Sequence, residues 1–106
     1  MCRVLDLAVN EYILDNRFQP SEILKFSGRI VEALNLVHFL SDDYMEAFTC
    51  CKIEGEYYVT VEDVDFTVKH RDLPVAFTLA CLASVGLDKE KVDDLKFEYN
   101  FEKGIL

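Results

Sequence analysis

The stretch from residue 73 to residue 85 constrains the fold more than any other part of the chain, because none of its residues is charged. Asp72 before it suits the N-cap of a helix, and Pro74 is tolerated in a first helical turn. Gly86 after it suits the left-handed conformation in which helices often end. A helix on the surface would carry a polar face. We therefore expect a helix over residues 73–85 that is covered around most of its circumference.

Two arrangements would cover such a helix. It can lie between a sheet and other helices of its own chain, or part of it can form the interface of a homodimer or of a complex with another partner. The chain has 106 residues, which is the usual size of one domain. We expect residues 1–106 to form a single domain with this helix in its core, and we keep the homodimer as the alternative.

Two further helices are expected near the N-terminus. In residues 2–16, apolar side chains recur at the three- and four-residue spacing of a helix. Residues 20–40 show the same spacing, and Pro20 suits the first position of a helix because its missing N–H would be unpaired there. Gly28 lowers the helix propensity of this second segment, so we expect it to allow close packing against the first helix.

A hairpin is expected in the middle of the chain. Residues 57–61 and 64–68 each alternate between apolar and polar side chains, and the alternation changes phase between them. A phase change indicates a tight turn or a bulge, since a continuous strand would present its apolar side chains on the opposite face. Glu54-Gly55 indicates another turn, and residues 45–53 fit either a helical turn or a first strand.

Residues 95–102 show the most regular alternation in the chain, and they predict a last strand after the apolar helix. The alternating apolar residues are Leu95, Phe97, Tyr99 and Phe101. Helices grouped before strands, with connections of hairpin length, predict an α+β fold. The expected order is two N-terminal helices, an antiparallel sheet of three to four strands, and one buried apolar helix before the last strand.

Negative charge is distributed unevenly along the chain. There are 20 acidic and 11 basic residues, which gives a net charge of −9, and the stretch 42–65 contains eight acids and one base. This stretch therefore carries −7 of the net charge, whereas the first forty residues are nearly neutral. Its acids are the candidate partner-binding residues: Asp42, Asp43, Glu46, Glu54, Glu56, Glu62, Asp63 and Asp65.

Three interpretations fit this acidic stretch. It can be a solvated face that keeps a small domain soluble. It can be a docking surface for a basic protein, where complementary charge raises the association rate and sets specificity, and in the extreme case it imitates a phosphate backbone. It can also hold a divalent cation around residues 62–65, although the stretch lacks the spaced oxygen ligands and the glycine of a calcium loop.

The same acidity argues against direct binding to nucleic acid or to anionic membranes, because both need basic residues. The chain has no basic stretch followed by an apolar run at its start, and no apolar stretch of about 20 residues, so we expect a cytoplasmic protein without a membrane span. Four cysteines in such a compartment are expected to be reduced.

No motif of catalysis or metal binding is present. His38 and His70 have no ligand-spaced neighbours, so we expect two ordinary, partly exposed histidines, with no metal and no cofactor. The four glycines are isolated, which excludes a glycine-rich phosphate loop. A site assembled in space from Cys50, Cys51 and a histidine is the alternative.

The size, acidity and helix–strand mixture resemble those of small bacterial secretion chaperones and of small viral proteins that inhibit host machinery, without a shared motif that would transfer residue roles. We expect a non-enzymatic protein-interaction module, acting as an acidic inhibitor, adaptor or chaperone-like protein, that docks a basic partner through residues 42–65. The alternative is a small enzyme or a ligand- or metal-binding domain with a site assembled in space. Exposed, contiguous acids favour the module, and a pocket with convergent polar groups favours the alternative.

Overall fold

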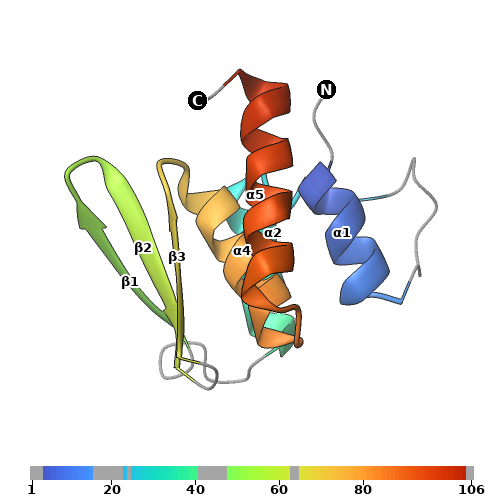
Figure 1. The fold of residues 1–106 in the computed structure, drawn as a ribbon. Helices are drawn as coiled ribbons and strands as arrows, with labels where there is room; N and C mark the ends of the chain where they lie inside the picture. Colours follow the sequence, from blue (N-terminus) through green and yellow to red (C-terminus); the bar gives the residue numbers. More distant parts are fainter. Residues whose placement is uncertain (1–3, 16–22, 24, 41–47, 63–64, 105–106) are drawn as a thin grey trace.

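The computed structural model describes residues 4–15, 23, 25–40, 48–62 and 65–104, and it has the expected α+β fold (Figure 1). Within these residues, two helices come first, then a three-stranded sheet, then two more helices. The elements are α1 (Val4–Tyr12), α2 (Ile30–Leu40), β1 (Phe48–Ile53), β2 (Glu56–Val61), β3 (Phe66–His70), α4 (Leu73–Ser84) and α5 (Lys89–Lys103). The helices lie on one side of the sheet.

The sheet is antiparallel in the order β1-β2-β3, which confirms the hairpin and identifies residues 48–53 as a strand. Ile53 pairs with Glu56 across a two-residue turn. Both turn residues have positive φ angles, 52° at Glu54 and 83° at Gly55, as a type I′ turn requires. This turn matches the right-handed twist of the strands on either side of it.

The phase change between the two alternating segments is the turn between β2 and β3. Val61 pairs with Phe66, and the N–H of Asp65 donates to the carbonyl of Glu62 at 3.3 Å. Each strand therefore keeps its apolar side chains on the face toward the helices, where Val59 and Val68 are buried. On the opposite face, the hydroxyls of Thr60 and Thr67 lie 2.9 Å apart.

Helix α4 lies at the centre of the molecule, between the sheet and the other helices (Figure 1). It packs against α1, α2, α5, β2 and β3. Every residue from Val75 to Ala83 is buried, and the hydroxyl of Thr78 donates to the Pro74 carbonyl at 2.7 Å. The expected core helix is confirmed, and other helices and strands of the same chain bury it. Gly86 has a φ of 104° just after the helix, as expected.

The predicted strand over residues 95–102 is wrong, because these residues belong to α5. The carboxylate of Asp88 caps the start of α5 by accepting the N–H of Lys91 at 2.8 Å, and Gly104 ends the helix in the left-handed conformation. The helix buries Val92, Leu95 and Tyr99, which have helical spacing. Phe97 and Phe101 are 63% and 68% exposed, so the regular alternation does not mark one buried face.

The two N-terminal helices are shorter than expected. α1 falls within the predicted segment, but α2 begins at Ile30, and Pro20 lies outside the described residues. Gly28 belongs to a turn before α2 rather than to a helix. The buried carboxylate of Asp6 accepts the N–H of Ser27 at 2.8 Å. A side chain of α1 therefore stabilises this turn.

Candidate functional site

The acids predicted to bind a partner do not form one patch in the described part of the chain. Glu54 and Glu56 lie at the β1–β2 turn, and Glu62 and Asp65 lie at the β2–β3 turn. These turns are at opposite ends of β2, which is about 17 Å long at about 3.3 Å per residue. The other four acids lie outside the described residues: Asp42, Asp43, Glu46 and Asp63.

The four described acids are accessible to solvent to different degrees. Glu54, Glu62 and Asp65 are exposed. Glu56 is partly buried, and its carboxylate lies 3.4 Å from the Nζ of Lys69, a surface ion pair worth about 0–1 kcal/mol. The carboxylate of Glu62 lies 3.5 Å from the hydroxyl of Thr49 on β1, so it reaches across the hairpin.

Strand β1, between the two groups of acids, is an open edge of the sheet. It has β2 on one side and no described strand on the other. Five of its six residues are exposed, and the main contacts of α4 with the sheet are to β2 and β3. The sequence carries no signal for this feature, because the segment is as apolar as an internal strand and only the strand order shows that it lies at the edge.

The edge presents backbone groups as well as side chains. A type I′ turn makes Ile53 and Glu56 a hydrogen-bonded pair, and such pairs alternate along an antiparallel ladder. The N–H and C=O groups of Cys50 and Lys52 therefore point away from β2. Lysine side chains on edge strands often prevent pairing with another strand. The Nζ of Lys52 lies 5.2 Å from the centre of the Tyr57 ring, so this lysine extends back over the hairpin.

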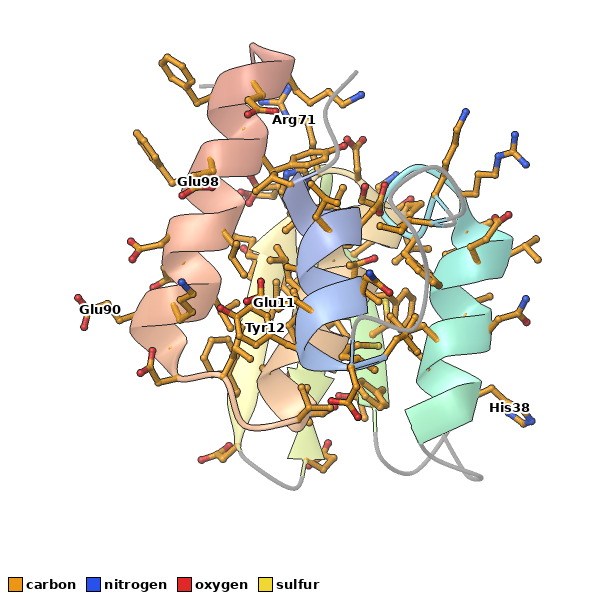
Figure 2. The ribbon with its side chains drawn as sticks, turned by 90° about the vertical axis from the view of Figure 1, so that its right-hand side faces the viewer. Glu11, Tyr12, His38, Arg71, Glu90 and Glu98 are labelled. Atoms are coloured by element: carbon orange, nitrogen blue, oxygen red, sulfur yellow. The ribbon has the colours of Figure 1, made fainter. Side chains whose placement is uncertain are left out.

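The cysteines and histidines do not form a joint site in the described structure. Cys50, Cys51 and Cys81 are free thiols, and burial together with the neighbouring Cys51 raises the pKa of Cys50. His38 is exposed on α2, at the right in Figure 2. Within the described ranges, no group of three or more His, Cys, Asp or Glu side chains could hold a metal ion.

His70 is buried, which corrects the expectation that both histidines are partly exposed. Its Nδ1 accepts the N–H of Asp72 at 2.9 Å, and its Nε2 lies 2.7 Å from the Oδ1 of Asn100. Burial lowers the pKa of His70 below its usual value. The ring is therefore neutral with its proton on Nε2. Its hydrogen bond to Asp72 stabilises the connection between β3 and α4.

A surface cleft of about 490 Å³ lies beside this corner. It is formed where the turn before α2, the start of β2, the β3–α4 corner and the end of α5 meet. Arg71 and Lys103 line it together with Tyr57 and Tyr99, and Figure 2 shows Arg71 near the C-terminal end of α5. The residues that line the cleft come from four separate segments without a shared motif, so the sequence carries no signal for it.

Comparison of the chain with protein-family models, with curated proteins and with solved structures finds no match. No helix in the described part of the chain is long and apolar enough to cross a membrane.

Proposed function

We propose that this chain is a non-enzymatic protein-interaction module that receives a basic, extended segment of a partner protein along strand β1. The observation that carries the proposal is the open edge of β1 between two groups of acids from the 42–65 stretch. Glu54 and Glu56 lie at one end of this edge, and Glu62 lies at the other.

Backbone hydrogen bonds would supply part of the affinity. An extended peptide can add a strand to an exposed sheet edge, where main-chain groups bind it and alternate side chains set specificity. The outward N–H and C=O groups of Cys50 and Lys52 give such a peptide its first partners. The exposed side chain of Ile53 offers an apolar contact at the end of the same edge.

The acids would select a basic segment. Complementary charge raises the association rate and suppresses wrong partners. Because the two groups are separated by the length of the hairpin, a partner with basic residues about six positions apart in an extended segment would meet both of them. The net charge of −9 adds attraction at longer range, which salt would weaken.

The conformation of Glu54 is consistent with a functional carboxylate at the hairpin tip. Its φ of 52° is a left-handed conformation, which costs a residue of this type about 1–2 kcal/mol. Asn or Asp before Gly is the usual choice in a type I′ turn. Strained residues tend to lie at functional sites, so the glutamate at this position supports the proposal.

The test uses a fluorescein-labelled peptide of about eight residues in which lysine and valine alternate, with binding followed by fluorescence anisotropy. We expect Glu54→Lys/Glu62→Lys to weaken binding at least about tenfold. A matched reversal of two exposed acids away from the hairpin, Glu11→Lys/Glu102→Lys, changes the net charge equally and is expected to have a much smaller effect.

A second variant separates edge pairing from charge attraction. Cys50→Pro removes an outward N–H that β2 does not use, and proline is tolerated on edge strands at such positions. We expect it to weaken the lysine–valine peptide without reducing the stability of the sheet. Equal loss of binding in both charge-reversal variants, or unchanged binding to Cys50→Pro, would exclude docking at the β1 edge.

The cleft supports a second candidate function, a domain that binds a small anionic ligand. Its volume of about 490 Å³ is in the range of ligand sites. Arg71 and Lys103 bring two positive charges to it against one negative charge from Asp72, in a strongly acidic chain. Titration with inorganic phosphate, followed by backbone amide shifts, tests this candidate. Shifts around the cleft that disappear in Arg71→Ala/Lys103→Ala would support it, and their absence would exclude phosphate as the ligand class.

A further inference from the structure

Helix α5 has the two most exposed aromatic side chains in the described structure. Phe97 is 63% exposed and Phe101 is 68% exposed. They are four residues apart, so they are neighbours on one face of the helix. Single exposed apolar residues are common on protein surfaces, whereas adjacent aromatic side chains mark contact sites. Phe97 also borders a shallow hollow of about 270 Å³ together with Asp93, Lys96 and Asn100.

Exposed acids surround the two phenylalanines. Asp93 and Asp94 lie four and three residues before Phe97, and Glu98 lies three residues before Phe101, so each is a surface neighbour of a phenylalanine. Glu90 extends the same face by one turn, and Figure 2 shows Glu90 and Glu98 on the outer side of α5.

The lysines of α5 lie toward the body of the molecule instead. The Nζ atoms of Lys89 and Lys91 are each 6.0 Å from the centre of an aromatic ring, Phe66 and Tyr12 respectively. The Nζ of Lys103 is 5.9 Å from the ring centre of Tyr99.

Lys96, the remaining lysine of the helix, is partly buried, and burial lowers its pKa. A helix with nearly balanced charge in its sequence therefore presents an outer face of aromatic and acidic side chains.

We propose that this aromatic–acidic face (Glu90, Asp93, Asp94, Phe97, Glu98 and Phe101) docks a basic amphipathic helix of a partner protein. Such a helix would place apolar side chains on the two phenylalanines and basic side chains on the surrounding acids. A second copy of this chain fits the face less well, because it would bring one set of acids against another. The face shares no residue with the β1 edge, so this inference is independent of the proposed function.

The test uses two fluorescein-labelled peptides of about fourteen residues, both made of leucine and lysine only. In the first, leucine recurs at helical spacing, and in the second it alternates strictly with lysine. We expect the first to bind and Phe97→Ala/Phe101→Ala to weaken it at least about tenfold. Val31→Ala is the matched control: Val31 is 64% exposed on α2, so its truncation removes apolar surface elsewhere and should leave binding unchanged.

Further variants test the contribution of the acids and the possibility of a dimer. Asp94→Lys/Glu98→Lys is expected to weaken the helical peptide at least about tenfold, and Glu54→Lys/Glu62→Lys is expected to leave it within about twofold. The inference is overturned if the helical peptide does not bind, if the alternating peptide binds α5 equally well, or if Val31→Ala weakens binding as much as the phenylalanine variant. Sedimentation showing a dimer that Phe97→Ala/Phe101→Ala dissociates would assign the face to a second copy, and would also overturn it.

Discussion

The Nε2 atom of His70 lies 2.7 Å from the Oδ1 atom of Asn100, which joins the end of β3 to α5. The Nδ1 atom of the same ring accepts the N–H of Asp72, the residue before α4. One neutral imidazole therefore links the sheet, the start of the central helix and the last helix. A second proton on the ring would have to occupy Nδ1, where it would oppose the N–H of Asp72.

The first prediction concerns pH. Burial lowers the pKa of His70 in the folded chain, whereas an unfolded histidine has a pKa of about 6.5. Between these two pKa values the unfolded state binds more protons than the folded state. The stability that neutral His70 contributes is therefore complete above about pH 6.5, and it is lost as pH falls through the folded pKa. We expect the wild type to lose more unfolding free energy than His70→Gln between about pH 7.5 and 5.5, measured by urea denaturation.

Two further variants test the cause of this difference. Asn100→Asp places a carboxylate beside the Nε2 of His70, so it should raise the pKa of the ring and reduce the loss of stability at low pH. Asn100→Ala removes the hydrogen bond at Nε2 without adding a charge, so it should not reduce this loss. Parallel pH profiles for the wild type and His70→Gln would contradict the assignment of the effect to His70.

The central part of the fold could be predicted because local and global signals agree there. The stretch between Asp72 and Gly86 has boundary residues at both ends and no polar face, so both its helical conformation and its burial follow from the sequence. Asp72 occupies the N-cap position as expected, although its side chain makes no capping hydrogen bond. The two segments that became β2 and β3 alternate, and their change of phase marks the turn between them. In each case the pattern reports which side chains the core covers.

Helix α5 and the candidate site could not be predicted in the same way. The period-two pattern from Leu95 to Phe101 assumes that every apolar residue faces the core, whereas the exposed Phe97 and Phe101 do not. The acids of residues 54–65 are close in sequence, but a hairpin places its two turns at opposite ends of the strand between them. The open edge of β1 depends on the order of the strands in the sheet, which is a tertiary property.

The second prediction distinguishes the observed helix from the strand that the sequence indicated. Leu95→Ala should cost about 2–5 kcal/mol of unfolding free energy, because this side chain is buried. Phe97→Ala should change the same quantity by no more than about 0.5 kcal/mol, because the ring is exposed. In a strand both residues would share one face and cost similar amounts. Urea denaturation of the two variants decides between the conformations.

The third prediction concerns Cys81, which is fully buried in α4. Burial also raises the pKa of its thiol, and the thiolate is the reactive form. In a chain with the other three cysteines replaced by serine, we expect a thiol reagent to label Cys81 only as fast as the protein opens. Added urea should therefore accelerate labelling steeply. A chain that keeps only the exposed Cys51 is the matched control and should react at once in native buffer.

The fourth prediction concerns the left-handed conformation of Glu54. Asn tolerates a positive φ better than Glu, and Asn-Gly is the preferred pair for a type I′ turn. We expect Glu54→Asn to raise the free energy of unfolding by up to about 1 kcal/mol, measured by urea denaturation. Glu54→Gln removes the same charge but keeps the unfavourable conformation, so it should give little of this gain. Equal stabilisation by both variants would assign the effect to relief of charge repulsion instead of to the turn.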